Sequence, residues 1–140
     1  MATTTATITL SSTDMMDNNI SISNTATLTN QGNDTGMTKT TGLARQTIAS
    51  ASNLVLLDSG ASGGTAAQQA ITKGKVYIKN VNDRGDGTKY VTVLLQAAEI
   101  GRLYGGDWMF FPWEGGSGND VEVTASDATS TVLEYIVFHE

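Results

Sequence analysis

The chain has 140 residues, a formal net charge of −6 and no cysteine. A chain of this length is typical of one domain and can bury roughly two-thirds of the surface that its unfolded form exposes, so we expect a single domain over residues 1–140. The absence of cysteine excludes a disulfide framework and thiolate chemistry. Eight Lys and Arg residues, scattered singly among 14 Asp and Glu residues, argue against a nucleic-acid partner.

Nothing in the sequence indicates a membrane partner. The first residues, Met1 to Thr5, lack the basic and apolar segments of a secretion signal, and no apolar run approaches the roughly 20 residues that span a bilayer. The composition is instead rich in Thr, Ser, Asn and Gly, which suits strands and turns.

The first 30 residues alternate between apolar residues and Thr or Ser. Ala6, Ile8 and Leu10 would lie on one side of a strand whose other side is Thr, and residues 20–29 continue the alternation. This period of two predicts strands with one polar face. We expect residues 1–30 to form either an added strand pair or an arm that reaches a neighbouring molecule.

The next segments differ in their patterns. Residues 31–41 are mostly Gly, Asn, Asp and Thr and predict a loop, and residues 43–48 predict a short strand. Residues 54–57 are apolar on both faces, which predicts an interior strand. Residues 66–71 have the best helix propensity of the chain, but at this length they could form either a turn or two of helix or a loop.

The middle of the chain carries the clearest hairpin pattern. Residues 75–81 and 90–95 are predicted strands, and residues 82–87 between them contain an Asp-Gly pair suited to a connecting loop. Residues 100–104 predict a further strand, and Gly105-Gly106 permits a sharp reversal after it.

The last two predicted strands differ in their faces. Residues 120–125 alternate and predict a half-exposed strand, whereas residues 131–139 are apolar on both faces apart from Glu134. About nine short strands without crossover helices predict an all-β fold, an antiparallel β-sandwich with a jelly-roll-like arrangement.

An aromatic tract, Gly106 to Trp113, contains both Trp residues of the chain. Aromatic residues are enriched in the cores of protein interfaces, so we predict that this tract and the two-faced final strand contact another subunit. The alternative is that they fill the core of their own domain. We expect substitution of Trp108 or Trp113 to weaken assembly more than folding. The interface candidates are Trp108, Phe110, Phe111, Trp113, Tyr135 and Phe138.

One motif matches an enzyme pattern. Leu56 to Ser62 has the order of an aspartic-protease active-site loop, in which Asp58 would pair with a second carboxylate from a dimer partner. The later apolar-apolar-Gly element of that family is not met, because Glu99 stands where an apolar residue is needed. The same string is also ordinary turn chemistry, and we expect a non-enzymatic protein.

Other short motifs have ordinary explanations. Arg84-Gly85-Asp86 is an integrin-type tripeptide on a polar turn, and this loop lacks the ligand order of an EF-hand. Gly60 to Thr65 lacks the Lys of a phosphate-binding loop, and His139 is the sole His of the chain. We therefore expect no cofactor and no metal.

The second half of the chain resembles small β-sandwich decoration, or cement, proteins of tailed-bacteriophage capsids. The resemblance is carried by five segments: Lys75 to Asn80, Tyr90 to Val93, Ile100 to Trp113, Asp120 to Ala125, and Leu133 to Phe138. All of them except Tyr90 to Val93 follow, in order, the patterns "apolar-Tyr-Ile-Lys-Asn", "Arg-Leu…Gly-Asp/Glu…Phe-apolar-Pro", "Asp-apolar-x-Val-x-Ala" and "Glu-Tyr-x-Val-Phe".

This resemblance implies a jelly-roll-like virion protein, commonly a homotrimer, that binds the major capsid protein on the outer capsid surface and clamps seams between capsid subunits. Such a protein is made in the bacterial host cytoplasm. The main alternative is a tail-fibre or baseplate module whose Trp108, Trp113, Tyr104 and Tyr90 stack on host glycans. The remote alternative is the dimeric protease with Asp58.

Overall fold

The computed structural model describes most of the chain: residues 4–13, 19–28, 37, 39–49, 52–59, 71, 73–85, 87–115, 118–126 and 131–139. The described residues contain strands and turns, and none belongs to a helix with the length and apolarity needed to cross a membrane. The chain divides into two compact units, Met1–Thr38 and Lys39–Glu140.

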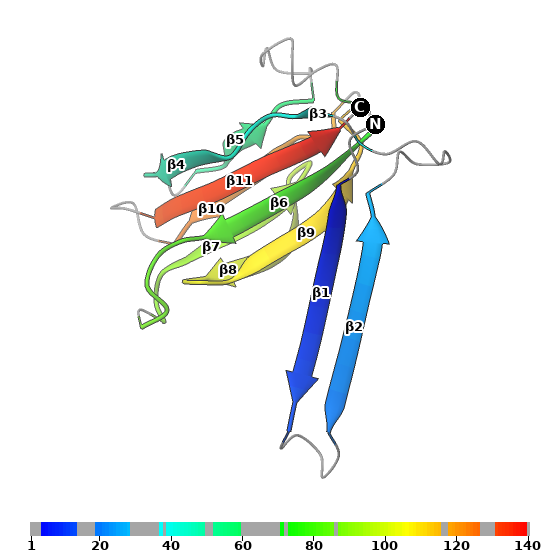
Figure 1. The fold of residues 1–140 in the computed structure, drawn as a ribbon. Helices are drawn as coiled ribbons and strands as arrows, with labels where there is room; N and C mark the ends of the chain where they lie inside the picture. Colours follow the sequence, from blue (N-terminus) through cyan, green and yellow to red (C-terminus); the bar gives the residue numbers. More distant parts are fainter. Residues whose placement is uncertain are drawn as a thin grey trace. The chain divides into compact units, whose positions relative to one another are not determined.

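The first unit contains an antiparallel hairpin of β1 (Thr5–Ser12) and β2 (Ile20–Thr27), drawn as the two long blue arrows in Figure 1. The register pairs Thr7 with Thr25 and Leu10 with Ile22. Because side chains alternate along a strand, one face of the hairpin carries hydroxyl side chains and the other is mainly Ala, Ile and Leu. This hairpin forms a two-stranded sheet of its own.

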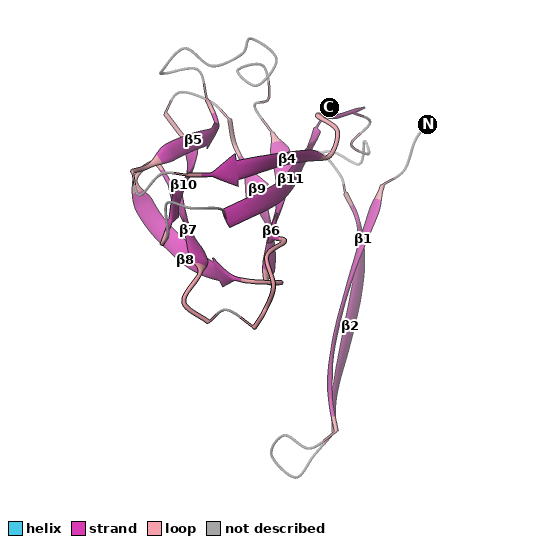
Figure 2. Cartoon of the chain, turned by 90° about the vertical axis from the view of Figure 1, so that its left-hand side faces the viewer, coloured by secondary structure: helices cyan, strands magenta, loops and turns pink. Residues whose placement is uncertain are grey.

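The second unit is a sandwich of two antiparallel sheets, which are seen facing one another in Figure 2. One sheet has the order β5-β10-β7-β8, and the other has the order β3-β11-β6-β9, with β4 also paired to β11. The strands are β3 (Lys39–Thr40), β4 (Ala44–Ile48), β5 (Leu54–Leu57), β6 (Gly74–Asn80), β7 (Tyr90–Leu95), β8 (Ala98–Tyr104), β9 (Trp108–Trp113), β10 (Val121–Ala125) and β11 (Thr131–His139).

The core lies between these two sheets and follows the alternation of the strands. Most of the alternate, inward-pointing side chains of β6, β7, β10 and β11 are buried, and Val or Ile occupies most of these buried positions. β-branched residues suit a pleated, half-buried surface, which explains why these segments form strands. The fully buried apolar side chains are Ile48, Leu57, Val76, Ile78, Val91, Val93, Val121, Val123, Leu133 and Val137.

The predicted all-β antiparallel β-sandwich is confirmed: the described residues form eleven strands, of which the nine from β3 to β11 make up the sandwich. Two details of the prediction are wrong. β6 and β7 do not form a hairpin: β6 pairs with β11 and β9, whereas β7 pairs with β10 and β8 in the opposite sheet. β5 is an edge strand with an exposed Val55, not an interior strand.

The structure describes two other predicted segments only in part. Residues 31–41 were expected to form a loop, yet β3 occupies two of them and pairs with the end of β11. The predicted helix or loop at 66–71 lies outside the described residues except for Ile71, which is buried.

Two turns have strong steric requirements. Gly106 has φ +82°, and a Cβ atom at Gly105 would overlap the carbonyl oxygen of Asp83. The predicted reversal at these glycines is therefore confirmed, and it places the aromatic tract on β9. The β7–β8 hairpin turns instead through Gln96 and Ala97, whose φ values of 48° and 63° are uncommon for residues other than glycine.

Candidate functional site

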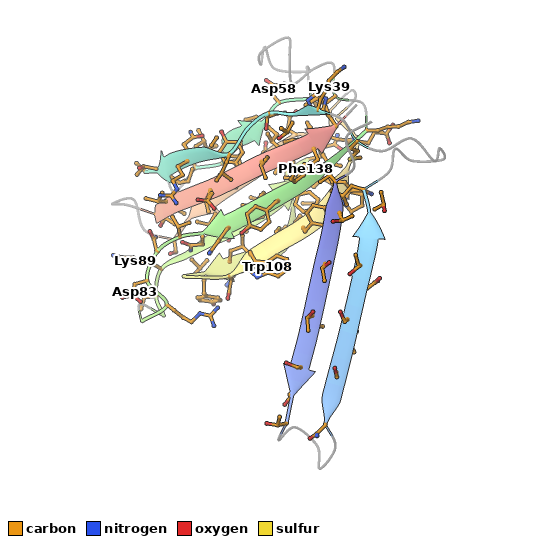
Figure 3. The ribbon with its side chains drawn as sticks, viewed as in Figure 1. Lys39, Asp58, Asp83, Lys89, Trp108 and Phe138 are labelled. Carbon is orange, nitrogen blue, oxygen red and sulfur yellow. The ribbon has the colours of Figure 1, made fainter. Side chains whose placement is uncertain are left out.

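The outer face of the β11-β6-β9 sheet carries a cluster of large apolar side chains. The register places Tyr77 between Ile136 and Phe110, in a row across the three strands. These side chains alternate with buried core residues such as Val76 and Ile78, so they point away from the core. We call Tyr77, Trp108, Phe110, Ile136 and Phe138 the aromatic face; Figure 3 labels two of its members, Trp108 and Phe138.

The aromatic face is half-exposed. Trp108 is 49% exposed, and its ring lies 6.2 Å from the ring of Tyr77, centroid to centroid. Burial, and secondarily the negative charge of Glu134, raise the pKa of Tyr77 above its ordinary value. The two rings therefore pack sideways on one another, while the outer side of the layer is not covered by the other described residues of the sandwich.

Positive charge borders the aromatic face. Lys79 is opposite Trp108 and Glu134 in the register, and Lys75 is opposite Pro112 and Phe138. Arg45 on β4 donates from Nε to Glu134 Oε2 at 2.8 Å. These residues give the face three cations and one carboxylate, a net charge of +2, although the chain as a whole carries −6.

The structure divides the six interface candidates of the sequence between two sides of one sheet. Trp108, Phe110 and Phe138 lie on the aromatic face, whereas Phe111 and Tyr135 point inward and pack against the core. The sixth candidate, Trp113, also points inward. Tyr77 and Ile136 were not among the candidates, and the strand register that joins them to the others is not readable from local alternation.

Trp113 corrects an expectation from the sequence. Its side chain is 3% exposed and belongs to the core cluster, and its indole Nε1 donates to the carbonyl oxygen of Asn119 at 2.7 Å. The position beside a turn suggested a surface residue, but Trp113 is odd-numbered on β9 and shares the inward side with Phe111. Its substitution is expected to impair folding, in contrast to Trp108.

The outer face of the opposite sheet is more polar. Tyr90 and Tyr104 are cross-strand neighbours with ring centroids 5.4 Å apart, and the Arg102 guanidinium lies 4.9 Å from the Tyr90 ring centroid. Arg102 also pairs with Glu99, Nε to Oε1, at 3.1 Å. The four aromatic residues proposed for glycan stacking therefore do not form one platform: two lie here, Trp108 lies on the other sheet and Trp113 is in the core.

At the described end of the protease-like loop, Ser59 is held by hydrogen bonds to Asp120. Asp58 and Ser59 are buried where β5 ends. The Ser59 backbone N–H and hydroxyl both donate to Asp120 Oδ1, at 2.8 and 2.6 Å, and Gly118 N donates to Ser59 Oγ at 2.9 Å. These bonds fix the end of β5 against the start of β10.

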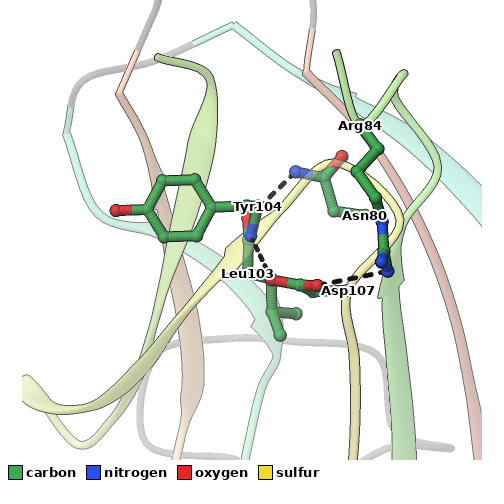
Figure 4. A network of polar contacts seen from close by, with 5 residues as sticks. All are labelled: Asn80, Arg84, Leu103, Tyr104 and Asp107. Atoms are coloured by element: carbon green, nitrogen blue, oxygen red, sulfur yellow. Dashed lines mark hydrogen bonds and ion pairs between the residues drawn. The ribbon is translucent and has the colours of Figure 1, made fainter. Parts of the chain in front are cut away.

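The turn that contains Arg84-Gly85-Asp86 is connected to the aromatic tract through polar contacts, shown in Figure 4. Arg84 Nη2 lies 3.5 Å from Asp107 Oδ1, and Asp107 Oδ2 accepts from the backbone N–H of Tyr104 at 3.1 Å. Asn80 Nδ2 donates to the carbonyl oxygen of Leu103 at 3.0 Å. Asp86 lies outside the described residues.

No group of three or more His, Asp or Glu side chains among the described residues is placed to hold a metal ion. His139 ends β11 opposite Lys39. The chain matches no protein-family model, and no curated protein or solved structure resembles it significantly. The surfaces of the molecule itself remain as evidence of function, and among the described residues of the sandwich the aromatic face places the rings of Tyr77, Trp108, Phe110 and Phe138 on one outer side of a sheet.

Proposed function

We propose that this chain is a non-enzymatic virion structural protein that decorates and stabilises a tailed-phage capsid by clamping seams between capsid subunits. The observation that carries the proposal is the aromatic face. Large apolar side chains bordered by cations occupy the outer side of one sheet, where an antiparallel sandwich is usually polar. Such an arrangement suits contact with an apolar, acidic surface on a partner.

The clamp would gain strength from its multivalency. A homo-oligomer, with a trimer favoured, presents several copies of the aromatic face at once. After one copy binds, the others bind at a high effective concentration, so weak individual contacts give strong overall attachment. A rigid sandwich suits this role because its interface side chains are already ordered, which lowers the entropic cost of binding.

The first test is the copy number and position of the chain in purified virions of the phage that encodes it. Decoration predicts many copies on the outer surface of the capsid, in contact with the major capsid protein. A few copies on the tail would refute decoration and would favour the glycan-binding alternative, for which isolated-domain binding to host glycans is the direct assay.

The second test separates the two outer faces of the sandwich. Trp108→Ser and Tyr104→Ser each remove an exposed aromatic ring, from opposite sheets, with exposed fractions of 49% and 41%. We expect Trp108→Ser to reduce attachment to undecorated capsids and Tyr104→Ser to leave it unchanged. Equal attachment of both variants would remove the aromatic face from the proposed contact.

A further inference from the structure

The β1–β2 hairpin has an apolar face that the other described residues of its own unit do not cover fully. Ile8, Leu10 and Ile22 share this face and are 39%, 57% and 55% exposed in the single chain. A two-stranded hairpin is at best marginally stable in water because it buries too little apolar surface. A further surface is therefore needed to complete the hairpin.

The two edges of the hairpin also carry unpaired backbone groups, and the register identifies them. Leu28 N donates to Thr4 O at 2.8 Å, so Thr4 and Leu28 form a hydrogen-bonded pair. Hydrogen-bonded and non-hydrogen-bonded pairs alternate along an antiparallel ladder. Every second residue therefore directs its N–H and C=O away from the hairpin: Thr7, Thr9 and Ser11 on β1, and Ser21, Ser23 and Thr25 on β2.

The side chains support this assignment. Thr7 Oγ1 and Thr25 Oγ1 are 2.8 Å apart, and Thr9 Oγ1 and Ser23 Oγ are 3.4 Å apart. Such close cross-strand approach is typical of non-hydrogen-bonded pairs. The outward N–H groups of these residues are thus available to a further strand.

The edge strands of the sandwich have features that prevent pairing with a further strand, whereas the two strands of the hairpin lack these features. At the sandwich edges, β8 carries Glu99 and Arg102 and pairs with β7 through a register shift, β9 contains Pro112, and β5 has only four residues. Charges, proline, bulges and short length are the usual devices that prevent edge pairing. β1 and β2 have eight residues each and contain no charge, no Pro and no Gly.

We propose that the hairpin is an assembly element: β2 of one copy pairs edge to edge with β1 of the next copy, in a closed ring of three hairpins. The occupant is a second copy of this chain because the two strands are uncharged, whereas the whole chain carries −6. Copies that repel one another elsewhere can approach at the hairpin without that cost. The proposal does not depend on the virion location.

The need to pair both edges of every hairpin determines that the hairpins join head to tail in a ring and how many of them the ring contains. Only a closed ring removes both edges of every hairpin, and a head-to-tail contact closes into a ring when the rotation allows it. Two hairpins supply four strands, too few to enclose a core, whereas three supply six. The face with Ile8, Leu10 and Ile22 lies inside this small barrel, and the Thr and Ser hydroxyls face water.

The sharpest test blocks one edge without changing the hairpin. Ser23→Pro removes an outward N–H, and Ser23→Ala is the matched control because both variants lose the same hydroxyl. Sedimentation of the full chain over a range of concentrations measures association. We expect a trimer for the unaltered chain and for Ser23→Ala. For Ser23→Pro we expect the association constant of each junction to fall about tenfold. Over three junctions, the equilibrium constant for trimer formation then falls about a thousandfold.

A second pair of variants tests which face lies inside. Thr9→Lys and Leu10→Lys place the same charge on adjacent residues of β1 that point to opposite faces. We expect Thr9→Lys to remain trimeric and Leu10→Lys to dissociate, because the barrel interior cannot hydrate an ammonium group. Dissociation of Thr9→Lys alone would overturn the proposed orientation of the faces.

Amide hydrogen exchange completes the test. In the trimer, the outward N–H groups of Thr7, Thr9, Ser21 and Ser23 should exchange slowly, and they should exchange rapidly in Ser23→Pro. A chain that is monomeric at all concentrations would refute the proposal, whether the outward amides exchange rapidly or are protected by its own sandwich. A trimer unaffected by Ser23→Pro would show assembly through another surface, which would overturn this inference and leave the proposed function standing.

Discussion

The two Trp residues of β9 offer a direct test of which side of the strand is the core. Trp113→Phe removes the hydrogen bond from Nε1 to Asn119 O, which is 2.7 Å long. The net loss of one such bond is about 1 kcal/mol, and a carbonyl left buried without a partner adds to it. The missing ring atoms leave a cavity that costs a further 1 kcal/mol or so. We expect a total destabilisation of about 2–3 kcal/mol.

Trp108→Phe is the matched control on the outer side. Trp108 is 49% exposed and lies beside the ring of Tyr77, so the variant should change the free energy of unfolding by no more than about 0.5 kcal/mol. For a sandwich of this size, the Trp113 variant should lower the melting temperature by about 10–20 °C, and the Trp108 variant by no more than a few degrees.

Urea denaturation followed by far-UV circular dichroism measures both free energies, at protein concentrations low enough that association does not contribute. Each variant also leaves a single Trp, whose fluorescence reports its surroundings: emission should be at shorter wavelength in Trp108→Phe than in Trp113→Phe. Equal destabilisation by the two substitutions would refute the division of β9 into a core side and an open side.

Three further predictions concern the sandwich. Ala97→Gly should stabilise the fold by about 1 kcal/mol in urea denaturation, because φ is 63° at this position; no gain would mean that the turn is not strained. Gly105→Ala should lower the free energy of unfolding by more than about 2 kcal/mol, because its Cβ would overlap the Asp83 carbonyl. Gly87→Ala is the control: a Cβ there meets open space, so the same assay should show a loss of less than about 0.5 kcal/mol. Burial raises the pKa of Tyr135 above its ordinary value, so the native state holds this proton more tightly than the unfolded state. The resulting stability is complete below about pH 10 and is lost as the pH rises through the folded pKa. Tyr135→Phe should therefore flatten the alkaline fall in stability, and an unchanged pH profile would contradict this assignment.

Local alternation was sufficient to locate most strands. Residues 120–125 and 131–139 were predicted as strands, within one residue of the bounds of β10 and identical to those of β11, because a half-buried strand imposes a period of two on its own sequence. The same alternation predicted the N-terminal strands, whose Thr and Ser residues share one face. The reversal at Gly105-Gly106 was predictable because these positions tolerate no side chain or need positive φ.

Pairing between strands was not predictable in the same way. The Asp-Gly loop at 82–87 indicated a hairpin, yet β6 and β7 lie in opposite sheets. The hairpin that does form, β7 with β8, turns through Gln96 and Ala97, which carry no turn signal because their conformation is imposed by the strands on either side.

The sequence by itself determined the chemical nature of this protein: an all-β chain with an aromatic tract and an uncharged, Thr-rich beginning. Only the tertiary structure decided which aromatic residues face outward. A period of two divides a strand into two faces but does not say which face meets the core, because that depends on the partner strands and the opposing sheet. Trp108 and Trp113 belong to one tract in the sequence, and the packing of β9 on β6 places them on opposite sides of a sheet.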